Sequence, residues 1–180
     1  LFDSVIQDNS EENWQRVDAW IASLYGLHQR DLQVISDTLR CSLPFAENRR
    51  CAQQPPTAAE ITHFCAALKT ELHPWAHRSE ISLTVREIPL PKSSPWGLIR
   101  IAPDDATAPP SPTTPDHWPE VLRLADDMGT TELIFPDETT GELLIGRLRQ
   151  ARYWSHSQAR LLARHIVWEH LDTLLGTVSA

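Results

Sequence analysis

The sequence predicts an α+β protein with two lobes. We expect a helical lobe over residues 1–78, and over residues 79–180 a lobe in which a small, mainly antiparallel sheet packs against helices. Two observations support this division. Apolar residues recur at helical spacing through the N-terminal part, whereas from Glu80 onward they nearly alternate with polar residues. With 180 residues, the chain can bury one sizeable core or two small ones.

Three helices account for the helical lobe. Gly26 ends the first, and the second begins near Asp31. The third opens on the capping-box spacing of Thr57 and Glu60 and is expected to stop before Pro74. The apolar positions that define the three helices are Trp14, Val17, Trp20, Ile21 and Leu24; Leu27, Leu32, Ile35 and Leu39; and Ile61, Phe64, Cys65, Leu68 and Leu72.

The second lobe should contain four strands and two helices. The first two strands are indicated by two apolar runs, which are Ile81, Leu83, Val85 and Ile88, and then Trp96, Leu98, Ile99 and Ile101. Residues 103–116 are rich in proline and predict an extended surface loop. The remaining predicted elements are a helix over 118–128, strands over 132–135 and 142–148 joined by a hairpin, and a final helix over 156–175.

Residues 146–170 form a basic island in an acidic chain. They include five arginines and a single acid, Glu169, whereas the whole chain has a net charge of −8. Arginine combined with exposed aromatic side chains binds phosphates and stacks on bases. We therefore predict DNA contacts by Arg147, Arg149, Arg152, Tyr153, Trp154, Arg160 and Arg164. In the alternative interpretation, the arginines lie on a solvated face while Tyr153 and Trp154 fill the core.

Overall charge limits what kind of nucleic-acid contact is expected. A net charge of −8 excludes a protein that coats nucleic acid non-specifically, so any contact must be confined to a patch. Arg49 and Arg50 form a second, smaller basic spot, which is interpreted as ordinary surface. No apolar run approaches the roughly 20 residues of a membrane helix, and no signal peptide is recognisable. We expect a cytoplasmic protein without a membrane partner.

Catalytic and metal-binding signatures are missing from the sequence. It contains no Walker loop, dinucleotide-binding glycine fingerprint, GxSxG elbow or HExxH motif, so no catalytic residue is predicted. His73 and His77 are four residues apart, but Pro74 is expected to break the helix that would align them. The three cysteines fit neither a disulfide framework nor a zinc site, and we expect reduced thiols at Cys41, Cys51 and Cys65. No metal site is predicted.

Two stretches of the chain resemble parts of known DNA methyltransferases. Residues 17–45, VDAWIASLYGLHQRDLQVISDTLRCSLPF, resemble the YGL segment and following helix found downstream of the catalytic domain in N6-adenine DNA methyltransferases of bacterial restriction-modification and phage-defence systems. Residues 143–171, LLIGRLRQARYWSHSQARLLARHIVWEHL, look like the QYRYW segment near the C-terminal ends of related proteins. The resemblance implies a target-recognition or accessory domain attached to a catalytic domain that binds S-adenosylmethionine.

The family's catalytic motifs do not occur in these residues. The NPPY-type motif that positions the target adenine and the glycine-rich loop that binds the methyl donor are both absent from the 180 residues. The chain begins with Leu1, and we expect it to be a piece of a parent protein that holds S-adenosylmethionine elsewhere. It should neither bind this cofactor nor transfer methyl groups unaided.

Three functions remain open at the level of sequence. The leading hypothesis is a DNA-recognition or DNA-positioning module whose partner is duplex DNA. The alternative is a protein-protein interaction module, in which the seven tryptophans and the acidic surface dock on a methyltransferase catalytic subunit or domain. A self-contained enzyme with an unfamiliar site is the third hypothesis.

Overall fold

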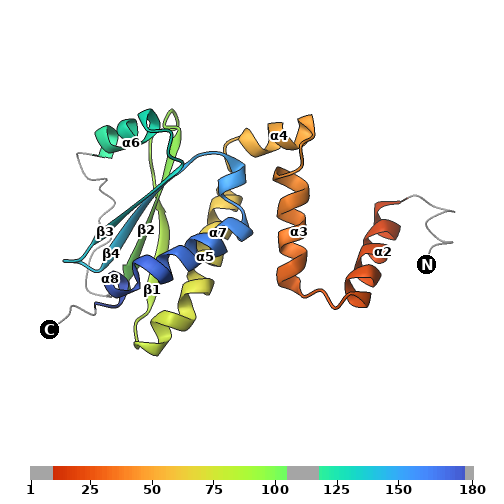
Figure 1. The fold of residues 1–180 in the computed structure, drawn as a ribbon, viewed down its shortest axis with the longest axis horizontal. Helices are drawn as coiled ribbons and strands as arrows, with labels where there is room; N and C mark the ends of the chain where they lie inside the picture. The colour runs from red at the N-terminus through yellow and green to blue at the C-terminus, as the bar shows by residue number, and fades with distance from the viewer. Residues whose placement is uncertain (1–9, 105–117, 177–180) are drawn as a thin grey trace.

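The computed structural model describes residues 10–104 and 118–176 and confirms the α+β class (Figure 1). The strands are β1 (Leu83–Ile88), β2 (Trp96–Pro103), β3 (Glu132–Asp137) and β4 (Glu142–Leu148). The helices are α2 (Glu11–Leu24), α3 (Gln29–Cys41), α4 (Ala46–Gln53), α5 (Ala58–Arg78), α6 (Trp118–Asp127), α7 (His156–Glu169) and α8 (Leu171–Leu175), and a 3-10 turn, η1 (Ala151–Tyr153), precedes α7. Most of the loop predicted over 103–116 lies outside the described residues.

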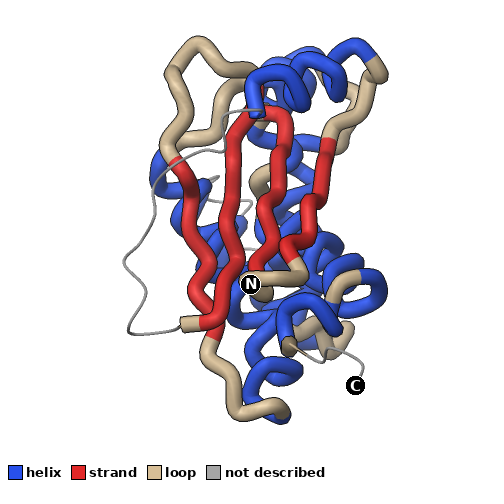
Figure 2. The backbone as a smooth tube through the Cα atoms, turned by 90° about the vertical axis from the view of Figure 1, so that its left-hand side faces the viewer, coloured by secondary structure: helices blue, strands red, loops and turns tan. Residues whose placement is uncertain are grey.

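The four strands form one antiparallel sheet in the order β1-β2-β4-β3, and Figure 2 shows them side by side. In the predicted hairpin between β3 and β4, Oδ1 of Asp137 accepts hydrogen bonds from the backbone N–H groups of Thr139 and Thr140. Gly141 completes this turn with a φ of +69°, a conformation that glycine adopts at little cost. The pairing places β2 and β4 at the centre of the sheet.

Each face of the sheet carries its own apolar core. α5 and α7 cover one face, where they pack on Ile99 and Ile101 of β2 and on neighbouring residues of β4. α6 covers the other face, where Trp96 and Leu98 of β2 meet Trp118. The alternation along β2 follows the two-residue period of a strand. Because α5 is part of the first core, the boundary expected after residue 78 separates residues that share one packed core.

Helix α5 runs straight through Pro74, so the prediction that the helix stops before this proline is wrong. A proline inside a helix removes one backbone hydrogen bond and crowds the preceding turn. Here, burial of Leu72 before the proline and of Ala76 after it keeps both flanking turns against the core. The uninterrupted helix also aligns His73 with His77, whose rings stack with centroids 5.4 Å apart.

The C-terminal helix predicted over 156–175 is divided into α7 and α8. His170 leaves the helical region with φ −135° and ψ 12°, and its N–H closes α7 by donating to the carbonyl of Ile166. The chain then turns so that α8 can bury Leu174 beside β4. Gly176 ends α8 in the left-handed conformation with φ +60°, as the sequence predicted.

The helices α2, α3 and α4 lie to one side of the sheet (Figure 1). α3 buries none of its residues, α2 buries Val17 and Ala22, and α4 buries Ala52. The sequence did not predict α4 because its eight residues, AENRRCAQ, carry almost no apolar pattern. No helix in the described part of the chain is long and apolar enough to cross a membrane.

Candidate nucleic-acid interface

Arg147, the first of the seven predicted DNA contacts, is enclosed in the core. Its side chain leaves β4 on the face covered by α5 and α7 and is only 4% exposed. Nη2 lies 3.0 Å from Oε2 of Glu132 and donates to Oε1 of Gln158 over 3.2 Å, and the guanidinium sits over the ring of Phe64. Burial lowers the pKa of Arg147, although Glu132 opposes this shift. In this fold Arg147 is not available to a ligand.

Trp154 is enclosed as well, in agreement with the alternative interpretation of the sequence. It is 2% exposed, packs its ring against Phe64 at a centroid distance of 5.3 Å, and donates its indole N–H to the carbonyl of Leu148. Tyr153 is half-buried and packs against the same core. These contacts show that the aromatic pair serves packing here.

Arg160 and Arg164 lie on different sides of α7. Arg160 turns toward α5, where its Nε is 3.3 Å from Oε1 of Glu71, and it also donates to the carbonyl of Arg30 in α3. Arg160 is therefore engaged in a partly buried ion pair. Arg164 is exposed on an outer stripe of α7 that also includes Trp168, whose side chain is 84% exposed.

The structure brings the remaining basic residues together with a second segment. The backbone N–H of Ala151 in η1 donates to the carbonyl of Gln54 directly after α4, and the two elements pack on each other. This contact brings the segment that carries Arg49 and Arg50 next to the segment that carries Arg149 and Arg152, although the two are about 100 positions apart in the chain. We call this group the basic corner, and its members are Arg49, Arg50, Arg149 and Arg152.

The side chains of the basic corner are not neutralised by acids. No salt bridge within the described residues involves any of the four arginines. Arg152 is exposed and lies over the ring of Tyr153, with its Cζ 4.9 Å from the ring centroid. Arg49 is also exposed and donates to the carbonyl of Pro44. Arg149 is half-buried, and its Nε has no hydrogen-bond partner.

Acidic residues gather at the opposite end of the sheet. The register pairs Leu83 with Pro103 and Asp137 with Glu142, so the start of β1, the end of β2 and the β3–β4 turn meet there. The acids at this end are Glu80, Asp104, Asp137, Glu138, Glu142 and Asp172. One of them is already paired, because Glu142 receives two hydrogen bonds from Arg100. Acids therefore predominate at this end of the sheet.

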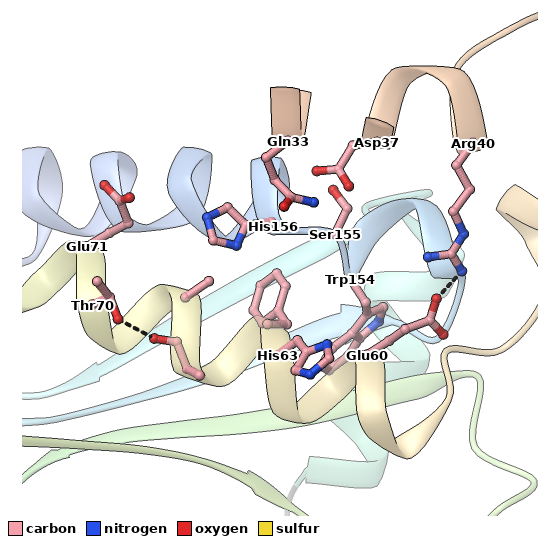
Figure 3. A pocket seen from close by; sticks show the side chains of 13 residues that line it. Gln33, Asp37, Arg40, Glu60, His63, Thr70, Glu71, Trp154, Ser155 and His156 are labelled. Carbon is pink, nitrogen blue, oxygen red and sulfur yellow. Dashed lines mark hydrogen bonds and ion pairs between the residues drawn. The ribbon is translucent and has the colours of Figure 1, made fainter. Parts of the chain in front are cut away.

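A polar cavity lies between α3, α5 and the start of α7 (Figure 3). Its acidic residues are already engaged. Asp37 accepts a hydrogen bond of 2.8 Å from the backbone N–H of Ser157 in the first turn of α7, and Glu60 is paired with Arg40. The ion pair with Glu60 raises the pKa of Arg40. The cavity is thus the seam where α3 is attached to the rest of the protein.

The histidines of this cavity do not form a metal site. His63 and His156 both line it (Figure 3), yet no group of three or more metal-ligating side chains occurs among residues 10–104 and 118–176. The three cysteines are free thiols, as expected, and burial raises the pKa of Cys65 to about 11.

Comparisons with family models, curated proteins and solved structures found no match to this chain. The resemblance to adenine methyltransferases stays a prediction. The sequence predicted DNA contacts along residues 147–164, but it did not predict that this segment packs against the helix that carries Arg49 and Arg50. No local signal predicts this packing, since it depends on contact between α4 and η1. The enclosure of Arg147 did have a signal, because the two-residue period places it on the same face as Leu143 and Ile145.

Proposed function

We propose that this chain is a DNA-positioning module that binds backbone phosphates of duplex DNA through the basic corner, working with the catalytic domain or subunit of a methyltransferase-like restriction-modification or phage-defence protein. The observation that supports it is the contact between α4 and η1, which joins two segments carrying four arginines, none of which forms a salt bridge with the described residues. An arginine already paired with a carboxylate must lose that pair to bind phosphate, whereas an unpaired one gains a bidentate contact.

The surroundings of the basic corner favour a localised contact. Arg152 is held over the ring of Tyr153, which limits the freedom that its guanidinium would lose on binding. Acidic groups at the far end of the sheet disfavour DNA contact there. Four phosphate contacts give a slope of log K against log salt concentration that is no steeper than about −3.6. This corresponds to modest affinity for DNA, which is lost as the salt concentration rises. A contact of this strength is suited to positioning DNA that another part of the protein binds, rather than to binding DNA tightly by itself.

A salt titration tests the proposal. Binding of the 180-residue chain to a fluorescent duplex of about 20 base pairs is measured by anisotropy at a series of salt concentrations. The double variant Arg50→Gln, Arg152→Gln should flatten the slope of log K against log salt by about 1.8, since each lost phosphate contact contributes about 0.9. Both side chains are exposed, so the fold should be unaffected.

Two matched controls remove an arginine elsewhere. Arg147→Met removes a buried charge and Arg164→Gln an exposed charge on α7, and neither should alter the slope. Absence of binding by the wild-type chain at low salt would refute the proposal. An unchanged slope in the corner variant, together with a flattened slope in Arg164→Gln, would move the interface to the outer stripe of α7.

A second candidate function is protein-protein interaction, and the apolar faces of α2 and α3 favour it. Leu24, Tyr25 and Leu39 are 64%, 74% and 56% exposed, and Leu24 and Leu39 belong to the apolar pattern that predicts the two helices. Contiguous exposed apolar surface on a folded protein usually marks a docking site. In the sequence-based form of this hypothesis, the partner is a methyltransferase catalytic subunit or domain.

A further inference from the structure

The apolar residues of α2 and α3 follow the spacing of a helical bundle. On α2 they are Trp14, Val17, Ile21 and Leu24, and on α3 they are Leu32, Ile35 and Leu39. Successive positions are three or four residues apart on both helices, the spacing that keeps one narrow stripe facing partner helices. Helices that carry such a stripe are stable when other helices cover it from more than one side.

The two stripes face a shared groove that stays open. Ile21 from α2 and Leu32, Ile35 and Leu39 from α3 line this groove, which we call the α2–α3 groove. These four side chains remain 36–56% exposed. Each helix therefore covers the other only in part, and within residues 10–104 and 118–176 the pair forms a single layer.

The other described elements do not supply a second layer. α3 contacts α5 and α7 through polar groups, with Arg30 bound to Glu71 and Asp37 capping the start of α7. Figure 1 shows α2 on the far side of α3 from the sheet. The apolar groove thus lies on the side of α3 that α5 and α7 leave uncovered.

We propose that the α2–α3 groove docks on the same groove of a second copy of this chain, so that two helix pairs form a four-helix bundle. The proposal goes beyond the DNA contact and names a partner for the second candidate function. In a two-fold interface each patch meets itself, so the two layers must match in length and charge. α2 and α3 have 14 and 13 residues, and the charged residues of the groove are one acid, Asp18, and one base, Arg40.

The exposed apolar area is sufficient for a stable dimer. Nine apolar side chains of α2, α3 and the turn between them are 36–74% exposed. Together they leave on the order of 800 Å² uncovered, which is an upper limit for the area that the groove and its surroundings can bury and reaches that of an interface of standard size. The nine residues are Trp14, Trp20, Ile21, Leu24, Tyr25, Leu32, Val34, Ile35 and Leu39.

The oligomeric state of the 180-residue chain tests this inference. Sedimentation equilibrium over a concentration series up to about 100 µM should give twice the monomer mass of 20.4 kDa. The double variant Leu24→Glu, Ile35→Glu should weaken dimerisation by at least about 100-fold, since both charges would be buried in the apolar seam. Amide exchange should show protection of α2 and α3 that rises with concentration in the wild type only.

The control double variant is Leu124→Glu, Leu161→Glu, which places the same charges on exposed apolar positions of α6 and α7. It should stay dimeric, and circular dichroism should show that both double variants remain folded. A wild-type chain that is monomeric at every concentration overturns the inference, and a catalytic subunit then becomes the expected partner. A dimer that persists in the folded groove variant also overturns it. Titration of the Leu24→Glu, Ile35→Glu variant with DNA measures binding by the basic corner separately from dimerisation.

Discussion

Gly97 shows how a single missing side chain determines the packing of Trp154. A Cβ at this position of β2 would stand 2.5 Å from Cζ2 and 2.9 Å from Cη2 of the indole. Real carbon atoms do not approach so closely, and Trp154 is held in place by its hydrogen bond to Leu148 and its contact with Phe64. Glycine is required here for space, so that the tryptophan can lie flat against the strand.

We predict that Gly97→Ala lowers the free energy of unfolding by about 1–3 kcal/mol, the usual cost of overpacking a rigid site. Gly146→Ala is the matched control. Its Cβ would lie 3.3 Å from Cδ2 of Leu122, which a flexible side chain can relieve. Urea denaturation of both variants measures the difference. Equal stability of Gly97→Ala and the wild type would show that Trp154 can shift without cost.

At the scale of elements, α3 is attached to the rest of the fold by charged groups. Glu71 of α5 receives hydrogen bonds from Arg30 of α3 and from Arg160 of α7. Partial burial alone would raise the pKa of Glu71, but these two arginines outweigh it and lower the pKa below its ordinary value. A carboxylate with a lowered pKa stabilises the fold at neutral pH and loses that contribution as the pH falls through its folded-state pKa.

Acidification should therefore release α3 before the core unfolds. We predict that amide protection of α3 falls as the pH drops below about 4.5, while α5 remains protected. At pH 7, Glu71→Gln should increase local opening of α3 by roughly fivefold, which corresponds to about 1 kcal/mol for the lost ion pairs. Glu138→Gln, in the exposed β3–β4 turn, should change nothing. Simultaneous loss of protection in α3 and α5 would contradict this view of the attachment.

At the scale of the whole molecule, the two candidate surfaces are distinct. The basic corner involves α4 and η1, whereas the apolar groove is formed by α2 and α3. Both lie outside the two apolar cores that hold the sheet. The proposed DNA contact and the proposed docking of a second copy therefore use different elements and do not exclude each other.

We predict that the isolated chain does not bind S-adenosylmethionine, because the glycine-rich loop expected for the methyl donor does not occur in its sequence. Isothermal calorimetry should register no binding heat, and the ligand should leave the melting temperature unchanged. Duplex DNA at low salt should raise the melting temperature and serves as the positive control. An increase of several degrees with S-adenosylmethionine would reveal a site that neither the motifs nor the geometry indicated.

Much of the secondary structure could be predicted because its signals are local. Gly26 ends α2 with a φ of +63°, and Thr57 and Glu60 form the expected capping box at the start of α5. Each signal involves residues within about one turn of each other, and the same holds for the alternation in the strands. The sequence by itself therefore determined the α+β class and the positions of most elements.

Only the tertiary structure decided which arginines can reach a ligand. Arg160 pairs with Glu71 across 89 positions of the chain, and Ser157 meets Asp37 across 120. Arg147 enters the core, while Arg152 lies on η1, which packs against the helix that carries Arg49 and Arg50. A charged side chain is equally compatible with solvent, a phosphate or a buried ion pair at the level of local sequence. The partners that distinguish these outcomes come from distant segments and are fixed by packing of the whole chain.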